Sequence, residues 1–154
     1  MSDSDEFRAQ VEEHRRRIET ALAKFADQLN DRARRHDLSK LEEPQFSAFS
    51  NHPRDRAIAY GSDKYMARLE VLGEALDHHY SIERHHPEFH EDGINGMTLV
   101  DLVEMFVDWH ITWSEHGAGA FREVIDLNRT RFGISDQLVE ILLNTAAQQA
   151  TASE

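Results

Sequence analysis

The sequence predicts an all-α protein, a compact bundle of roughly five or six main helices. Along most of the chain, apolar residues recur at spacings typical of a helix with one buried face. No stretch shows the apolar–polar alternation of a half-buried strand. Glycine, proline and short polar runs separate the periodic segments, so the helices are expected to be distinct and joined by turns.

The first predicted helix covers residues 7–29. Its apolar stripe includes Val11 and Ile18, and His14 lies between them at helical spacing. We therefore expect His14 to point toward the core. Asn30 and Asp31 are residue types that cap helices, and they predict a second, short helix that carries the next histidine.

Residues 43–62 contain Pro44 and the run Ser50-Asn51-His52-Pro53, which interrupt helical periodicity. They predict a loop with short helical turns, in a place suited to a lid. From Asp63 to about Tyr80 a helix resumes, and His79 continues its apolar face, whereas His78 is turned about 100° away.

The second half of the chain predicts three further helices. The segment 85–90 interrupts the preceding helix and 92–96 forms a turn, after which a helix begins at Thr98 and ends near Gly117 and Gly119. Another helix covers about 121–131. The run 133–135 then supplies a stop and a new cap for a last amphipathic helix.

Length and composition narrow the function classes. A chain of 154 residues predicts one domain over 1–154, with an ordered core over about 6–146. The net charge of -12 disfavours duplex nucleic acid and anionic membranes as partners. Cysteine is absent, so thiolate metal sites and cysteine nucleophiles are excluded. An acidic N-terminus and the lack of a long apolar stretch predict a soluble, cytoplasmic protein.

Ten histidines predict a metal site built from nitrogen and oxygen ligands. Such ligands suit iron, manganese, cobalt, nickel or zinc. So many donors indicate one or two divalent ions, with Asp37 bridging a pair. In chain order the candidate ligands are His14, His36, Asp37, His79, His85, His86 and Asp108.

Three further residues are candidates for the chemistry beside the metal. Lys40 lies one helical turn from Asp37, so its ammonium is placed to meet a phosphate or a catalytic hydroxide, and Arg84 is a second candidate anion clamp. Glu104 lies four residues before Asp108 and is placed to orient a ligand histidine or to accept a proton. Because two close metal ions acidify water and neutralise a phosphoryl oxygen, these residues predict phosphoester hydrolysis.

The order of these residues resembles the HD-domain superfamily of helical metal-dependent phosphohydrolases. His36-Asp37-Leu38-Ser39-Lys40 is similar to the His-Asp-x-Gly-Lys form of that superfamily, with Ser39 in place of glycine. The run 84–88, Arg-His-His-Pro-Glu, looks like the histidine pair of the cyclic-dinucleotide phosphodiesterase branch, but the Gly-Tyr-Pro that should follow is missing. The interval from His79 to His85 is also short for the superfamily.

A narrower resemblance covers roughly residues 10–145. His14, the HDLSK run at 36–40, the RHHPE run at 84–88 and the EMFVDW run at 104–109 resemble a family of short, mostly uncharacterised bacterial and phage proteins. The resemblance implies an HD-like fold and a bound metal, but it brings no substrate.

Three functions are compatible with these residues. The first is a metal-dependent phosphohydrolase that uses a metal-activated hydroxide on a nucleotide or another small phosphorylated metabolite. The second is an HD-like di-iron oxygenase. The third is a non-catalytic HD-like module that binds a nucleotide or a protein. A homo-oligomer is compatible with all three.

Overall fold

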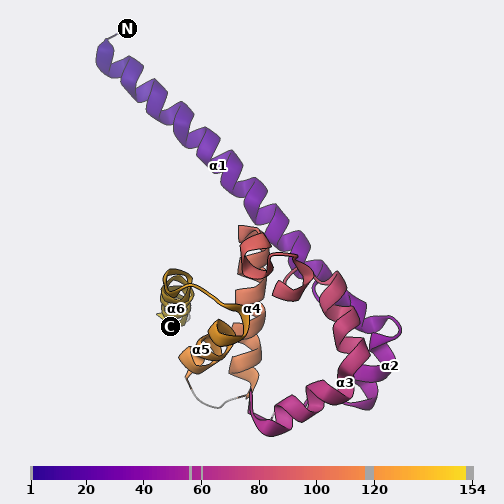
Figure 1. Cartoon of the computed structure of the whole chain (residues 1–154). Helices are drawn as coiled ribbons and strands as arrows, with labels where there is room; N and C mark the ends of the chain where they lie inside the picture. The colour runs from indigo at the N-terminus through magenta and orange to yellow at the C-terminus, as the bar shows by residue number, and fades with distance from the viewer. Residues whose placement is uncertain (1, 56, 60, 117–119, 152–154) are drawn as a thin grey trace. The chain divides into compact units, whose positions relative to one another are not determined.

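The computed structural model describes residues 2–55, 57–59, 61–116 and 120–151. Every regular element in that part of the chain is helical, which confirms the all-α prediction (Figure 1). The chain divides into two compact units, Met1–His36 and Asp37–Glu154. The expectation of a single domain stays a prediction.

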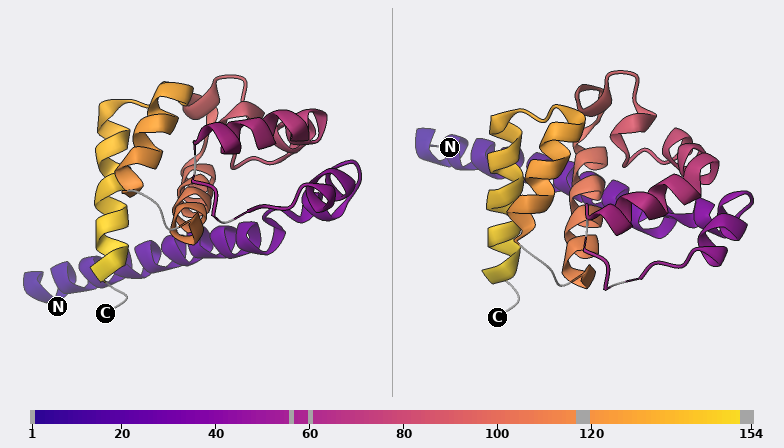
Figure 2. Two further views of the ribbon diagram at one scale, coloured as in Figure 1. Left: turned by 90° about the horizontal axis from the view of Figure 1, so that it is seen from below. Right: turned by 60° about the horizontal axis from the view of Figure 1, so that its bottom comes forward.

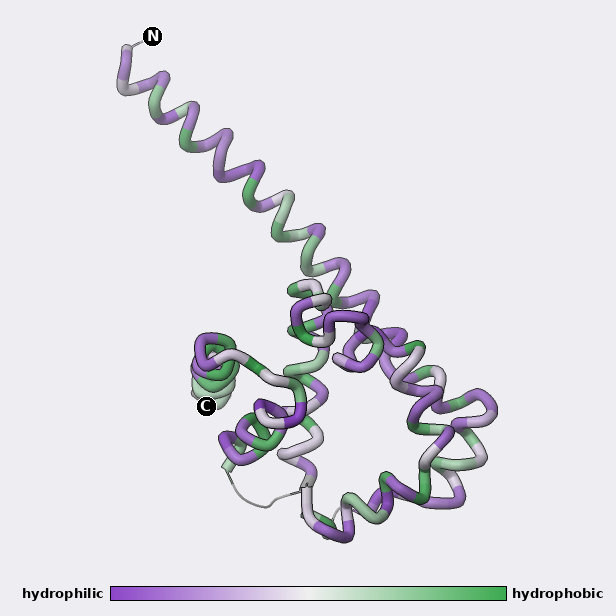
Figure 3. The backbone as a smooth tube through the Cα atoms, viewed as in Figure 1, coloured by the Kyte–Doolittle hydropathy of each residue, from purple (hydrophilic) through white to green (hydrophobic). Residues whose placement is uncertain are grey.

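The first unit is one long helix, α1, over Asp3–Arg35. Ser2 begins it with a capping box to Asp5, and acidic residues in the first turn and arginines in the last complement the helix dipole. The helix is thus longer at both ends than the predicted 7–29. Figure 3 shows its apolar residues recurring among polar ones. No described residue of α1 is buried, so within this unit His14 is exposed rather than core-facing.

The predicted short helix around His36 and Asp37 is wrong. Residues 30 and 31 continue α1, and His36 ends it as the C-cap. Asp37 then adopts a left-handed conformation with φ 60° and ψ 11°, which is costly for most side chains but tolerated by aspartate. A 3₁₀ turn over Leu38–Leu41 follows directly. The motif residues therefore lie on a sharp turn, where backbone strain is often functional.

The next two α-helices supply one wall of the second unit. α2 covers Gln45–Asn51 within the predicted loop, and α3 covers Asp63–Ile82 with Ser62 as its N-cap. Gly73 interrupts α3 with φ 30° and ψ -111°, a conformation that glycine alone adopts without strain. As predicted, His79 is buried on α3 and His78 is exposed.

Two 3₁₀ turns, Pro87–Phe89 and Gly93–Gly96, connect α3 to α4 over Leu99–His116. The helix begins one residue after its predicted start at Thr98, whose backbone N–H and hydroxyl both donate to Asp101 Oδ2. Leu99, at the start of α4, is 68% exposed, whereas Met105 is fully buried. The buried face of α4 therefore includes Met105.

The apolar core of the second unit is formed by α4, α5 over Phe121–Phe132 and α6 over Asp136–Thr151, which lie beside one another in Figure 2. Gly133 ends α5 in the left-handed conformation, as predicted. The predicted helix end at Gly117 and Gly119 lies outside the described residues. The buried core side chains are Met105, Phe106, Trp109, Phe121, Val124, Ile125, Ile134, Val139 and Leu142.

Candidate metal centre

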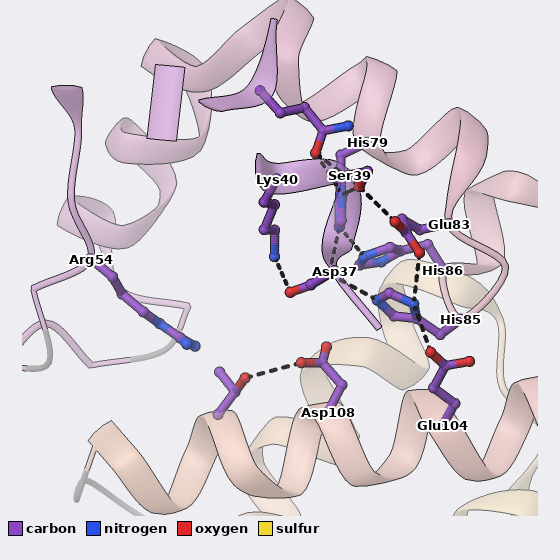
Figure 4. A network of polar contacts seen from close by, with 12 residues as sticks. Asp37, Ser39, Lys40, Arg54, His79, Glu83, His85, His86, Glu104 and Asp108 are labelled. Carbon is purple, nitrogen blue, oxygen red and sulfur yellow. Dashed lines mark hydrogen bonds and ion pairs between the residues drawn. The ribbon is translucent and has the colours of Figure 1, made fainter. Parts of the chain in front are cut away.

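Four side chains of the second unit converge beside the Asp37 turn (Figure 4). Asp37 Oδ1 lies 3.3 Å from His79 Nε2 and 3.8 Å from His85 Nε2. His86 Nε2 lies 3.0 Å from His79 Nε2. One nitrogen from each of the three histidines lies within 4.8 Å of the others. Two nitrogens that share an ion at about 2.1 Å are themselves roughly 3 to 4 Å apart, so the cluster has the dimensions of a metal site.

The hydrogen bonds behind His79 fix its tautomer. Gln45 places its Nε2 3.1 Å from His78 Nδ1 and its Oε1 3.0 Å from His79 Nδ1. The amide oxygen only accepts, so Nδ1 of His79 carries the hydrogen and Nε2 carries a lone pair. That lone pair faces the Asp37 carboxylate and His86, as expected of a metal-ligating histidine whose other nitrogen is held from behind.

Burial keeps the imidazole rings of His79 and His86 uncharged. Burial, and next the Lys40 charge, lower the pKa of His79 to about 3. Burial, together with His85 and His79, also lowers the pKa of His86. Both rings are therefore neutral near pH 7, the state in which imidazole binds metal. The Asp37 carboxylate then supplies the negative charge of the cluster.

His85 is fully buried, and two carboxylates lie on the Nδ1 side of its ring. Its Nδ1 lies 3.5 Å from Glu104 Oε1 and 3.8 Å from Glu83 Oε2. Acceptors on the Nδ1 side favour the hydrogen there and leave Nε2, on the Asp37 side, as a donor to metal. The predicted role of Glu104, to orient a ligand histidine or to accept a proton, stays a prediction.

The second oxygen of Asp37 is held by Lys40, whose Nζ lies 2.5 Å from Oδ2. A second ion bound to Oδ2 would compete with this ammonium. This competition disfavours a second ion bound through Oδ2, and the number of bound ions stays a prediction.

One predicted ligand of the second unit, Asp108, lies outside the cluster. Asp108 accepts a hydrogen bond from Thr112 at 3.5 Å and lies across from Lys40 in Figure 4. Among the described residues, it does not join the groups whose donor atoms lie within 4.8 Å of one another. His14, exposed on α1, and His36, the C-cap of α1, belong to the first unit. Metal ligation by these three residues stays a prediction.

Arg84, expected to clamp an anion, contacts a protein carboxylate. Its Nε and Nη2 donate to the two oxygens of Asp101 at 3.2 and 3.1 Å, and its guanidinium lies 5.2 Å from the centre of the Phe89 ring. Arg84 is not among the described residues that line the pocket beside the cluster. Arg84 therefore connects α4 to the turn that precedes it.

A pocket of about 350 Å³ opens beside the cluster, in the usual range for a small-molecule site. Asp37, His79, His86 and Asp108 line it, and so do aromatic side chains including Tyr80 and Trp109. Four basic side chains from separate segments also line it, although the chain as a whole carries a charge of -12. They are Lys40, Arg54, Arg68 and Arg131.

Several of these residues were not predicted from the sequence. Gln45 is 1% exposed, yet it lies in a short helix without a clear apolar pattern. Its burial beside the histidines is therefore visible only in the structure. Glu83 follows α3 and receives a hydrogen bond from Ser39 at 2.6 Å. Arg54 and Arg68 look like ordinary surface charges in the sequence. An excess of basic residues around one pocket of an acidic chain is visible only after folding.

Comparison with known proteins gives a family but no activity. No curated protein and no solved structure matches the chain. Among the described helices, none combines the length and the apolar character needed to cross a membrane. One family model matches residues 3–148, nearly the whole chain, and the protein therefore belongs to the family of unknown function DUF5662.

Proposed function

We propose that this protein is a metal-dependent phosphohydrolase that acts on a nucleotide or another small phosphorylated metabolite. The observation that carries the proposal is the pairing of a neutral histidine–carboxylate cluster with basic side chains in one pocket. His79, His85, His86 and Asp37 would hold the ion. A divalent transition metal there would lower the pKa of a bound water and offset charge on a phosphoryl oxygen.

The basic residues nearest the cluster are suited to the phosphoryl group. Lys40 lies against Asp37, and Arg131 lies with its guanidinium carbon 5.7 Å from the centre of the Tyr80 ring. Both charges act on His86, since each lowers its pKa. Two cations near the histidines would attract a phosphate and stabilise the additional charge of its transition state, although Arg131 also pairs with Glu88 at 2.5 Å.

Hydrolysis adds water to phosphorus and breaks the bond from phosphorus to the leaving oxygen, which takes up a proton. Asp108 lines the same pocket as Asp37, so its carboxylate is a candidate to receive or return that proton. Glu104 would act through His85, as a positioning residue, because it lies behind the ring and on the Nδ1 side.

The direct test is phosphate release from a panel of nucleotides and sugar phosphates by protein loaded with Mn²⁺, Fe²⁺, Co²⁺, Ni²⁺ or Zn²⁺. We expect hydrolysis by at least one metal form, and we expect Asp37→Ala to lose both metal and activity. Asp77→Ala is the matched control, since Asp77 is an exposed acid on α3 outside the pocket. Hydrolysis that survives chelation and the Asp37 substitution would contradict the proposal.

A further inference from the structure

The helix α1 exposes an apolar face along most of its length. No described residue of α1 is buried, and Phe7, Val11, Ile18 and Leu22 are 67, 41, 46 and 64% exposed. A helix in water gains most of its stability when its apolar face packs against another element. The described residues of the first unit, Met1–His36, contain no other helix or strand for α1 to pack against. The apolar face of α1 is therefore a candidate interface.

This face is a straight stripe whose spacing is the same from either end. Its successive members lie 4, 3, 4, 4, 3 and 4 residues apart. At about 100° per residue they all fall within an arc of about 80°, so the stripe does not wind around the helix. Ile18 is the central member, and each member before it has a counterpart at the same distance after it. The members are Phe7, Val11, His14, Ile18, Leu22, Phe25 and Leu29.

Such symmetry fits a two-fold axis that passes beside Ile18. In a dimer with a two-fold axis, residue i of one copy contacts residue j of the other, and j contacts i. When two antiparallel α1 helices meet at Ile18, Phe7 lies beside Leu29 of the other copy, and Val11 lies beside Phe25. We propose that α1 pairs antiparallel with α1 of a second copy of this chain, so that the protein is a homodimer.

The charges at the two ends of α1 favour the antiparallel orientation. Residues 2–6 contain three acids and no base, a charge of -3. Residues 31–35 contain three arginines and one aspartate, a charge of +2, and this sum includes Asp31, which pairs with Arg35 within the helix. Antiparallel pairing places each acidic end beside a basic end, whereas parallel pairing places like charges side by side. Such complementarity fixes the orientation of paired helices.

The flanks of the stripe are compatible with this pairing. Arg15 and Glu19 lie on one flank, and the two-fold axis brings Arg15 of each copy near Glu19 of the other. These two opposite-charge contacts offset the approach of the two Arg17 side chains near the axis on the other flank. Glu12 and Asp27 lie on the opposite face of α1, are exposed, and would stay in water.

The inference rests on α1 alone, so it is independent of the proposed metal and hydrolysis. Sedimentation equilibrium of the full-length protein over about 1 to 100 µM measures the pairing. We expect a dimer, which Ile18→Glu should weaken at least about 100-fold because two carboxylates then meet at the axis. Ala23→Glu is the matched control, since Ala23 is exposed on the opposite face of α1. A monomer at every concentration, or a dimer equally stable in Ile18→Glu, would overturn the inference.

Single cysteines test the orientation without relying on a disruptive variant. The chain has no cysteine, so each introduced thiol is unique. In Ile18→Cys the two Cα atoms at the axis lie about 5 Å apart for helices 8–10 Å apart, close enough for a disulfide. Oxidised glutathione should therefore link this variant into a covalent dimer.

Phe7→Cys and Ala23→Cys are the controls for that crosslink. The two Phe7 positions lie about 33 Å apart in the antiparallel pair, and Ala23 faces away from the interface, so both variants should stay largely unlinked. Parallel pairing would instead link Phe7→Cys as readily as Ile18→Cys. That result, or an Ile18→Cys protein that does not crosslink, would refute the antiparallel dimer.

Discussion

The Nε2 atoms of His79 and His86 face each other at 3.0 Å. Burial lowers the pKa of both rings, so both are neutral near pH 7. Gln45 holds the hydrogen of His79 on Nδ1, so in the metal-free protein His86 satisfies this contact by donating from its own Nε2. If an ion bound to both nitrogens, the His86 hydrogen would have to lie on Nδ1 instead.

His86→Ala should weaken binding of Zn²⁺ or Co²⁺ by at least about tenfold, because it removes one nitrogen ligand and leaves His79, His85 and Asp37. Competition with a chromophoric chelator measures the affinity. His52→Ala removes an exposed histidine that lies outside the pocket lining, and should bind metal like the unaltered protein. Equal affinities of the two variants would place the metal elsewhere.

Gln45→Leu should weaken metal binding about 10- to 100-fold, because the amide oxygen no longer orients the His79 ring. Gln45→Glu provides the matched comparison, since its carboxylate still accepts the Nδ1 hydrogen. It should retain most of the affinity. Competition with a chelator measures the metal affinity of both variants. If Gln45→Leu and Gln45→Glu lose affinity to the same extent, Gln45 acts by packing and not by orienting the His79 ring.

Lys40→Gln should reduce phosphate release by about 10- to 100-fold while leaving metal content unchanged, because Lys40 contacts Asp37 but is not itself a ligand. The ratio of turnover to bound metal is the quantity to compare. Lys64→Gln alters an exposed lysine at the start of α3 and should have no effect. A Lys40→Gln protein with full turnover would remove this residue from the catalytic machinery.

Asp101→Asn should destabilise the fold by roughly 1–3 kcal/mol at neutral pH, since the carboxylate is buried and receives bonds from Thr98 and Arg84. Burial acts to raise its pKa, but hydrogen bonds from the Thr98 backbone and from Arg84 lower it to about 2. With an unfolded value near 3.8, its stabilising effect is fully present above about pH 4 and is lost as the pH falls toward 2.

Urea unfolding of both proteins over this pH range gives the measurement. The difference in unfolding free energy between the unaltered protein and Asp101→Asn should shrink as the pH falls from 4 to about 2. A difference that stays constant over that interval would mean that the charge of Asp101 contributes nothing.

The helices were largely predictable because each leaves a local signal. Periodic apolar residues indicated α3 and α6, and Gly133 marked the end of α5. The turn at Asp37 was not predictable, because Asn30 and Asp31 resemble a helix cap whereas the helix continues through them. A left-handed aspartate has no reliable pattern in a sequence.

The candidate site was predictable in its residue types and less so in its partners. His79 was correctly placed on the buried face of α3, because it continues the apolar face of the predicted helix. Arg84 and Arg68 both lie in charged segments of the sequence. Only the tertiary structure shows that Arg84 pairs with Asp101, whereas Arg68 lines the pocket. Such contacts depend on how distant segments pack, which local pattern does not encode.

The proposed function depends most on a bound metal ion. Protein purified without a polyhistidine tag or chelators should contain about one transition-metal ion per chain by elemental analysis, or take up one on titration. The double variant His79→Ala and His86→Ala should contain none. Absence of metal from the unaltered protein after both purification and titration, or equal metal in the double variant, would contradict the account.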